Sequence, residues 1–134
     1  MAETANTDVC SPLELKEKLQ RRDDFILLDV RTPEELMIAC IEGCVHMPLN
    51  ELPKRVGELE PNRHKEIVTM CHHGMRSEMA QEFLLSRGFT SVRNLSGGID
   101  AYAEQVLIAA GEGAKAALSA YEYLTFRKLV ELEH

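Results

Sequence analysis

The chain has 134 residues, of which 45% are hydrophobic and 28% charged, so it fits one globular domain rather than two independent cores. Its formal net charge of −7 argues against a nucleic-acid binder, because backbone binding depends on Lys and Arg. No apolar run approaches the roughly 18 residues of a membrane span. Residues 1–8 lack the basic start and apolar stretch of a secretory signal, so we expect a flexible leader and a cytoplasmic protein.

The first half of the chain carries two helix starts with the same signature. Ser11 is followed by proline and, at Glu14, by an acidic residue, which predicts a short helix with a capping box. Thr32, Pro33 and Glu35 repeat this pattern and predict a second helix through about residue 39. Between them, the apolar run 25–30 is too short for a helix and predicts a strand buried on both faces, as in parallel sheets.

The remaining elements alternate in type. Further strands are expected over 45–47, 66–70 and 91–94, and residues 49–62 suit a helical turn wrapped in loop because they contain two prolines and a glycine. Helices are expected after the segment 71–77, ending at Gly88, and from about residue 99 to 109. This order predicts one α/β domain over 9–110 with a mainly parallel sheet.

The last part of the chain has more apolar surface than one helix face needs. We expect residues 111–131 to form a helical extension that packs across the domain, and a contact with a protein partner or a second copy is the alternative. The final residues 132–134 resemble the start of an expression tag, so we expect no function for them.

The segment between the 66–70 strand and the next helix indicates chemistry. Ligands of open parallel sheets bind beyond the carboxyl ends of the strands, which is where Cys71 stands. The loop 72–77 can turn backbone N–H groups toward the sulfur, and the next helix directs its positive end there, so a thiolate is favoured. Arg76 and partly protonated His72 or His73 would add to this effect, and Gly74 permits a positive φ angle.

A lone cysteine at the end of a buried strand is usually a small core hydrophobe. Here Cys, Gly and Arg lie within six residues between a buried strand and a helix, and this combination favours a nucleophilic cysteine. The same N–H groups would stabilise the terminal sulfur of a cysteine persulfide.

With these residues the chain resembles the single-domain rhodaneses from about residue 10 to 102. The resemblance rests on four blocks that stand in family order: 28–35 (LDVRTPEE), 41–48 (IEGCVHMP), 71–77 (CHHGMRS) and 94–102 (NLSGGIDAY). It implies a central parallel sheet of about five strands with helices on both faces. It also implies that Cys71 carries the persulfide and that 72–76 form the anion-binding loop.

The expected activity is that of a thiosulfate-type sulfurtransferase. Cys71 would attack the outer sulfur of thiosulfate or a persulfide, and a thiol or cyanide would then accept the sulfur, with no metal or organic cofactor. The donor would be held by Arg76 and by its neighbours in the loop, which are His72, His73, Gly74, Met75 and Ser77.

Two other functions stay open at this point. One is a sulfur-relay or binding module that acts only with a protein partner. The other is a cysteine phosphatase or arsenate reductase, which the loop length disfavours. Related phosphatases have one more residue between cysteine and arginine than the four between Cys71 and Arg76.

Several residues outside the loop are candidates for supporting roles. Asp29 and Arg31 would orient the loop, although capping or an ion pair with Glu34 or Glu35 explains them as well. Cys40 and Cys44 stand where the family usually has histidine and alanine. Either would be a buried residue or a second thiol that resolves a Cys71 persulfide. A metal site formed by these cysteines with His46, His72 and His73 is disfavoured, since the spacing lacks the usual zinc pattern.

Overall fold

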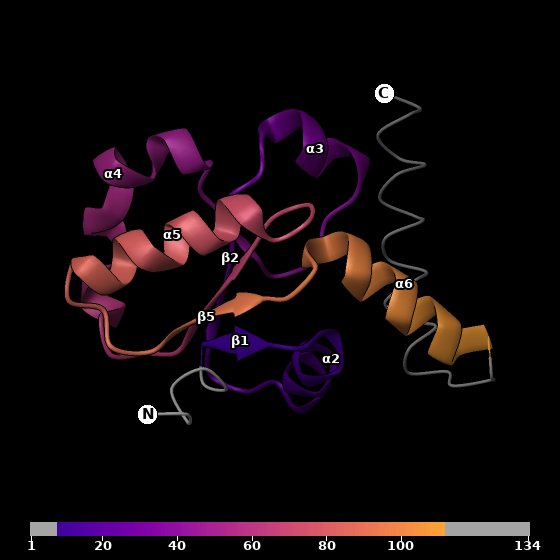
Figure 1. The fold of residues 1–134 in the computed structure, drawn as a ribbon. Coiled ribbons are helices and arrows are strands. Elements are labelled where there is room, and N and C mark those ends of the chain that lie inside the picture. Colours follow the sequence, from indigo (N-terminus) through magenta and orange to yellow (C-terminus); the bar gives the residue numbers. More distant parts are fainter. Residues whose placement is uncertain (1–7, 112–134) are drawn as a thin grey trace.

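The computed structural model describes residues 8–111 as a parallel sheet covered by helices on both faces (Figure 1). The elements, in chain order, are β1 (Val9–Cys10), α2 (Pro12–Arg21), β2 (Ile26–Asp29), α3 (Pro33–Ile38), β3 (Val45–His46), η1 (Leu49–Glu51), α4 (Leu52–Arg55), η2 (Val56–Asn62), β4 (Ile67–Met70), α5 (Met75–Ser86), β5 (Val92–Leu95) and α6 (Gly98–Gly111). The extension expected beyond Gly111, the tag-like end and most of the leader lie outside the described residues.

The five strands lie in the order β1-β5-β4-β2-β3, and every neighbouring pair is parallel. The register pairs Asp29 with Met70 and Thr69 with Asn94. The carboxyl ends of β2, β4 and β5 therefore meet at one edge of the sheet. This architecture confirms the α/β domain that the sequence predicts.

The core lies on both faces of the sheet because the side chains of each strand alternate between faces. Leu27 and Val68 belong to a cluster that α2 and α6 cover, whereas Leu28 and Ile67 belong to one covered by α4, η2 and α5. Figure 1 shows these two groups of helices on opposite sides of the strands. The loop after β4 is thereby held between two packed layers.

Both predicted capping boxes are present. The Ser11 hydroxyl accepts from the Glu14 N–H at 3.1 Å, and the Glu14 carboxylate accepts from the Ser11 N–H at 3.0 Å. Thr32 and Glu35 make the same reciprocal pair at the start of α3. These contacts satisfy N–H groups that have no partner within a helix.

Three features differ from the sequence prediction. Residues 49–62 form three consecutive short helices rather than one turn in a loop. The strand β1 was not expected, because two residues are too short to show a pattern, and its place is set by pairing with β5. Helix α5 begins at Met75, inside the expected loop. Among residues 8–111, no helix has the length and apolar character needed to cross a membrane.

Candidate functional site

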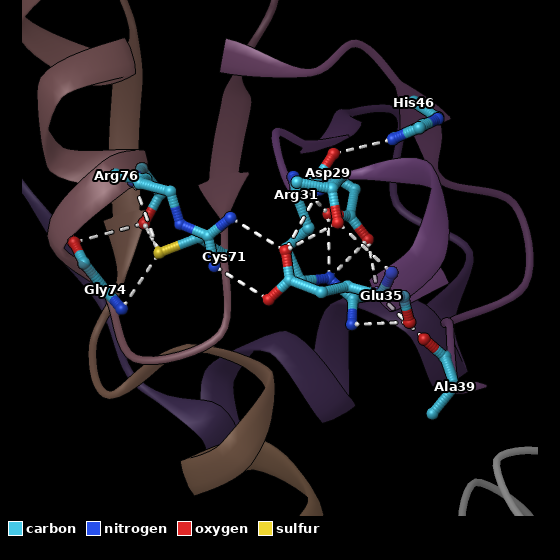
Figure 2. A network of polar contacts seen from close by, with 10 residues as sticks. Asp29, Arg31, Glu35, Ala39, His46, Cys71, Gly74 and Arg76 are labelled. Carbon is cyan, nitrogen blue, oxygen red and sulfur yellow. Dashed lines mark hydrogen bonds and ion pairs between the residues drawn. The ribbon is translucent and has the colours of Figure 1, made fainter. Parts of the chain in front are cut away.

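Cys71 stands directly after β4 and its side chain is buried, with 1% exposed. The backbone N–H of Gly74 donates to the Cys71 Sγ at 3.0 Å, and that of Ser77 donates at 3.4 Å. The Ser77 hydroxyl lies 3.3 Å from the same sulfur. Figure 2 shows the chain of the loop curving around the sulfur. The predicted cradle of backbone N–H groups is therefore present, and Gly74 has the expected positive φ of 111°.

The start of α6 fixes the other side of the loop backbone. The N–H of Ile99 donates to the Cys71 carbonyl at 2.8 Å, and that of Asp100 donates to the His72 carbonyl at 3.1 Å. Gly98 permits this approach because a Cβ atom there would overlap with both carbonyl oxygens. Since these carbonyls point to α6, the N–H groups that follow them are free to turn toward the sulfur.

Asn94, at the end of β5, joins the loop to the sheet. Its amide oxygen accepts from the Ser77 hydroxyl at 2.5 Å, and its amide nitrogen donates to the Gly74 carbonyl at 3.2 Å. Thr69 donates to the Ser77 carbonyl at 2.9 Å. Neither Asn94 nor Thr69 was predicted from the sequence as a site residue, although each precedes the end of a strand at the edge where Cys71 lies.

The electrostatic environment favours the thiolate of Cys71. Burial raises its pKa and is the largest single effect. Hydrogen bonds from the Ser77 hydroxyl and from the N–H groups of Ser77, Gly74 and His73 outweigh it together, so the pKa lies below its ordinary value. Cys10 is equally buried but has no such cradle, and burial raises its pKa to about 11 although Arg93 opposes this. The loop, rather than burial, therefore distinguishes Cys71.

Arg76 is bound by a carboxylate from another element. Its guanidinium forms a two-pronged ion pair with Glu35 of α3, at 2.7 and 2.8 Å (Figure 2). The pKa of Arg76 is raised, chiefly by the hydrogen bond to Glu35. The negative charge of the Cys71 thiolate makes a smaller contribution in the same direction, so Arg76 and Cys71 are close enough to influence one another. This pair could not be predicted from the sequence because its partners are 41 residues apart.

Asp29 and Arg31 pair with one another. Arg31 Nη2 lies 2.7 Å from the Asp29 carboxylate, and both side chains are buried. The same nitrogen donates to the Ala39 carbonyl at 2.8 Å, which ties the end of α3 to the end of β2. The ion pair of Arg31 is thus made with Asp29 and not with Glu34 or Glu35, the alternative that the sequence left open, and the Glu35 carboxylate binds Arg76 instead. Their role in orienting the loop stays a prediction.

The remaining loop side chains lie outside the cradle. His72, His73 and Met75 are exposed, and the two imidazole rings stack on each other at 3.9 Å. The structure therefore brings Cys71, Gly74 and Ser77 together but leaves these three side chains at the surface. Donor contacts with them stay a prediction.

Beside the loop lies an open cavity of about 220 Å³ between α3 and α6. Its polar lining includes Glu35, His72 and Asp100, and its apolar lining is formed by Ile38, Ala39, Ile99 and Ala103. This cavity shares Glu35 and His72 with the surroundings of Cys71.

The two additional cysteines lie after α3. Cys40 is buried, and Cys44 is half-buried and packs against the core cluster that α2 and α6 cover. Cys71 belongs to the cluster on the other face of the sheet. A resolving role for either cysteine stays a prediction. No group of three or more His, Cys, Asp or Glu side chains among the described residues is arranged to hold a metal ion.

The family model for the rhodanese-like domain matches residues 11–105. The chain belongs to this family. A sulfurtransferase of Allochromatium vinosum is 36% identical over 100 residues, which cover 74% of this chain and 92% of that protein. A putative sulfur carrier protein of Bacillus subtilis is 43% identical over 84 residues, covering 63% of this chain. The rhodanese-like chain spans only 44% of the length of that Bacillus relative.

Solved structures agree with this assignment. A human single-domain sulfurtransferase superposes with a TM-score of 0.65 at 26% identity, covering 73% of this chain and 96% of the human one. The resemblance to single-domain rhodaneses that the four sequence blocks predict is thereby confirmed.

Proposed function

We propose that this rhodanese-like protein is a sulfurtransferase that carries a sulfane sulfur as a persulfide on Cys71. The observation that carries the proposal is the set of N–H and O–H donors around one buried sulfur whose pKa lies below the ordinary value. The names of relatives as sulfurtransferase and sulfur carrier support the same reaction class.

In the first half-reaction, the Cys71 thiolate attacks the outer sulfur of the donor. The bond between the donor's two sulfur atoms breaks, and its electron pair leaves with the inner part as sulfite or a thiolate. The terminal sulfur of the resulting persulfide carries the negative charge, which the N–H groups of the loop stabilise without reorganisation. The same donors thus serve the thiolate and the persulfide.

In the second half-reaction, a thiol or cyanide attacks the terminal sulfur and restores the Cys71 thiolate. Because the first product, sulfite or a thiolate, leaves before the sulfur acceptor binds, the steady-state kinetics are expected to be ping-pong. We assign donor contacts to the loop 72–77 and a supporting role to Asp29 and Arg31, whose buried pair fixes the adjacent edge of the sheet.

Intact-protein mass spectrometry after incubation with thiosulfate or methanethiosulfonate and desalting tests this proposal. Wild type should gain one sulfur atom that cyanide removes, whereas Cys71→Ala should gain none. Cys10→Ala is the matched control, since it removes another buried thiol and should load normally. Loading of Cys71→Ala, or no loading of the wild type by either donor, would contradict the assignment.

A relay module that takes sulfur only from a protein partner is the second candidate, and the name of the Bacillus relative favours it. It predicts loading of Cys71 by a persulfidated protein but not by free donors. Rapid turnover of either small donor would exclude it.

A further inference from the structure

The guanidinium groups of Arg31 and Arg76 already have carboxylate partners. Arg31 is bound to Asp29 at 2.7 Å, and Arg76 is bound to Glu35 through both of its terminal nitrogens. The charges of these four residues cancel in pairs. A dianion such as thiosulfate, which approaches a negative thiolate, therefore meets a cation whose charge is already matched.

The Glu35 carboxylate is fixed from two sides. Its Oε1 atom accepts from the Arg76 guanidinium at 2.7 Å and from the Thr32 N–H at 3.0 Å, so it closes the capping box of α3 as well. The Arg76 hydrogen bond, the largest effect, lowers the pKa of Glu35 to about 2. Glu35 therefore stays charged at neutral pH and is held where it faces Arg76 (Figure 2).

The surroundings add acidic and apolar groups. Asp100 borders the cavity between α3 and α6, with the His73 imidazole 3.9 Å from its carboxylate, and Glu34 is exposed beside Glu35. Of the basic groups that line the cavity, Arg31 is bound to Asp29 and His72 is exposed. Ile38 and Ile99 line the same cavity and provide a surface for an aliphatic group. These features disfavour a small, highly charged donor and fit one with an uncharged body.

We propose that Glu35 determines the class of donor: by neutralising Arg76, it makes the site favour a sulfane-sulfur donor of low negative charge, such as an alkyl persulfide, over thiosulfate. This inference rests on the proposed function. With an alkyl persulfide, the Cys71 thiolate attacks the outer sulfur, and the bond between the donor's two sulfur atoms breaks. The inner sulfur leaves with the electron pair of that bond and takes up the proton of the outer sulfur as an alkyl thiol, so the terminal sulfur of the Cys71 persulfide carries the negative charge.

Glu35→Gln separates charge from structure. Glutamine at this position still accepts from the Thr32 N–H in a capping box, so α3 keeps its start. The variant loses the carboxylate and leaves Arg76 available to an anion. Glu34→Gln is the matched control, because it removes one negative charge from the adjacent, exposed position.

The experiment compares two donors that deliver the same outer sulfur and differ in charge. Thiosulfate is a dianion, and methanethiosulfonate is a monoanion. For each protein, kcat/KM for loading of Cys71 is measured with both donors. In Glu35→Gln, we expect kcat/KM to increase about tenfold or more with thiosulfate and about threefold with methanethiosulfonate. The reason is that the attraction between Arg76 and the donor scales with the charge of the donor. The gain should shrink as ionic strength rises.

The ratio of the two increases decides the inference. If Glu35→Gln loads Cys71 but leaves the preference between the donors as in wild type, or if Glu34→Gln changes it equally, the assignment to Glu35 is overturned while the persulfide mechanism stands. If neither donor loads any of the proteins, the proposed function itself fails, and the inference fails with it. Thermal unfolding of both variants establishes that they are folded.

Discussion

The Ser77 hydroxyl lies 2.5 Å from the Asn94 amide oxygen, 3.2 Å from the Gly74 carbonyl oxygen and 3.3 Å from the Cys71 sulfur, so its single proton has three acceptors within reach. When the sulfur is a thiolate, the charged acceptor is the stronger one and the proton should point toward it. When the sulfur is protonated, the Asn94 amide oxygen and the Gly74 carbonyl remain as acceptors. One hydroxyl can therefore follow the charge of Cys71 without a change of rotamer.

Ser77→Ala should raise the pKa of Cys71. The Ser77 hydroxyl is the largest of the effects that lower this pKa, and burial, which raises it, remains in the variant. Loss of a hydrogen bond to a charged group corresponds to a rise of about one to two pKa units. The thiolate absorbance of each protein as a function of pH, minus that of its Cys71→Ser counterpart, measures the shift.

Ser86→Ala, at the other end of α5, is the control for this titration and should leave the curve unchanged. An unaltered Cys71 titration in Ser77→Ala would mean that the backbone N–H groups alone stabilise the thiolate.

Asn94→Asp should also raise the pKa of Cys71, by roughly one unit. The substitution places a negative charge beside the Ser77 hydroxyl and the Gly74 carbonyl, and this charge disfavours the Cys71 thiolate, which is negative as well. The aspartate still accepts from Ser77 but no longer donates to Gly74. Asn50→Asp, an exposed substitution with the same change of charge, is the control. Equal titration of Cys71 in both variants would exclude Asn94 as a positioning residue.

Gly98→Ala should be more destabilising than the same substitution at Gly43 or Gly57. The new Cβ would overlap with the carbonyls of Cys71 and His72, and φ is +68°. At Gly43, φ is also positive, but a new Cβ would meet no atom within 4 Å. At Gly57, φ is not positive and the space around a new Cβ is likewise open. In urea unfolding, we expect the free energy of unfolding to fall by about 3 kcal/mol or more in Gly98→Ala, by about 1 kcal/mol in Gly43→Ala and by almost nothing in Gly57→Ala.

A loss at Gly98 no larger than that at Gly43 would show that strain in the backbone, rather than contact with the loop, sets the cost. The sulfur-loading rate provides a second measurement, since displacement of the two carbonyls should slow it in Gly98→Ala alone.

The Glu35 and Arg76 pair should contribute a pH-dependent stability. The pKa of Glu35 is about 2 in the folded protein, below its reference value of 4.5, chiefly because of the hydrogen bond from Arg76. The contribution is therefore present above pH 4.5, declines below it and is lost near pH 2. The difference in unfolding free energy between wild type and Glu35→Gln should follow this course, and a difference independent of pH would contradict it.

Much of the fold was predictable because its signals are local. The capping boxes at Ser11 and Thr32, the buried runs of β2 and β4, and the loop after Cys71 each occupy a few consecutive residues. The contacts that were missed join distant parts of the chain. Arg76 meets Glu35 across 41 residues, and Asn94 meets Ser77 across 17. Spacing along one sequence holds no information on such pairs, and β1 is too short to show periodicity.

The hydrogen bonds from α6 to the loop involve backbone atoms only, as do two of the donors to the Cys71 sulfur. The side chains of His72, His73 and Met75 are exposed and take no part in them, although the His73 imidazole lies 3.9 Å from the Asp100 carboxylate. The reactivity of the sulfur and the outer surface of the loop are thus encoded by different atoms of the same short segment. Exchange of these three side chains provides a route to new acceptor preferences with an unchanged nucleophile.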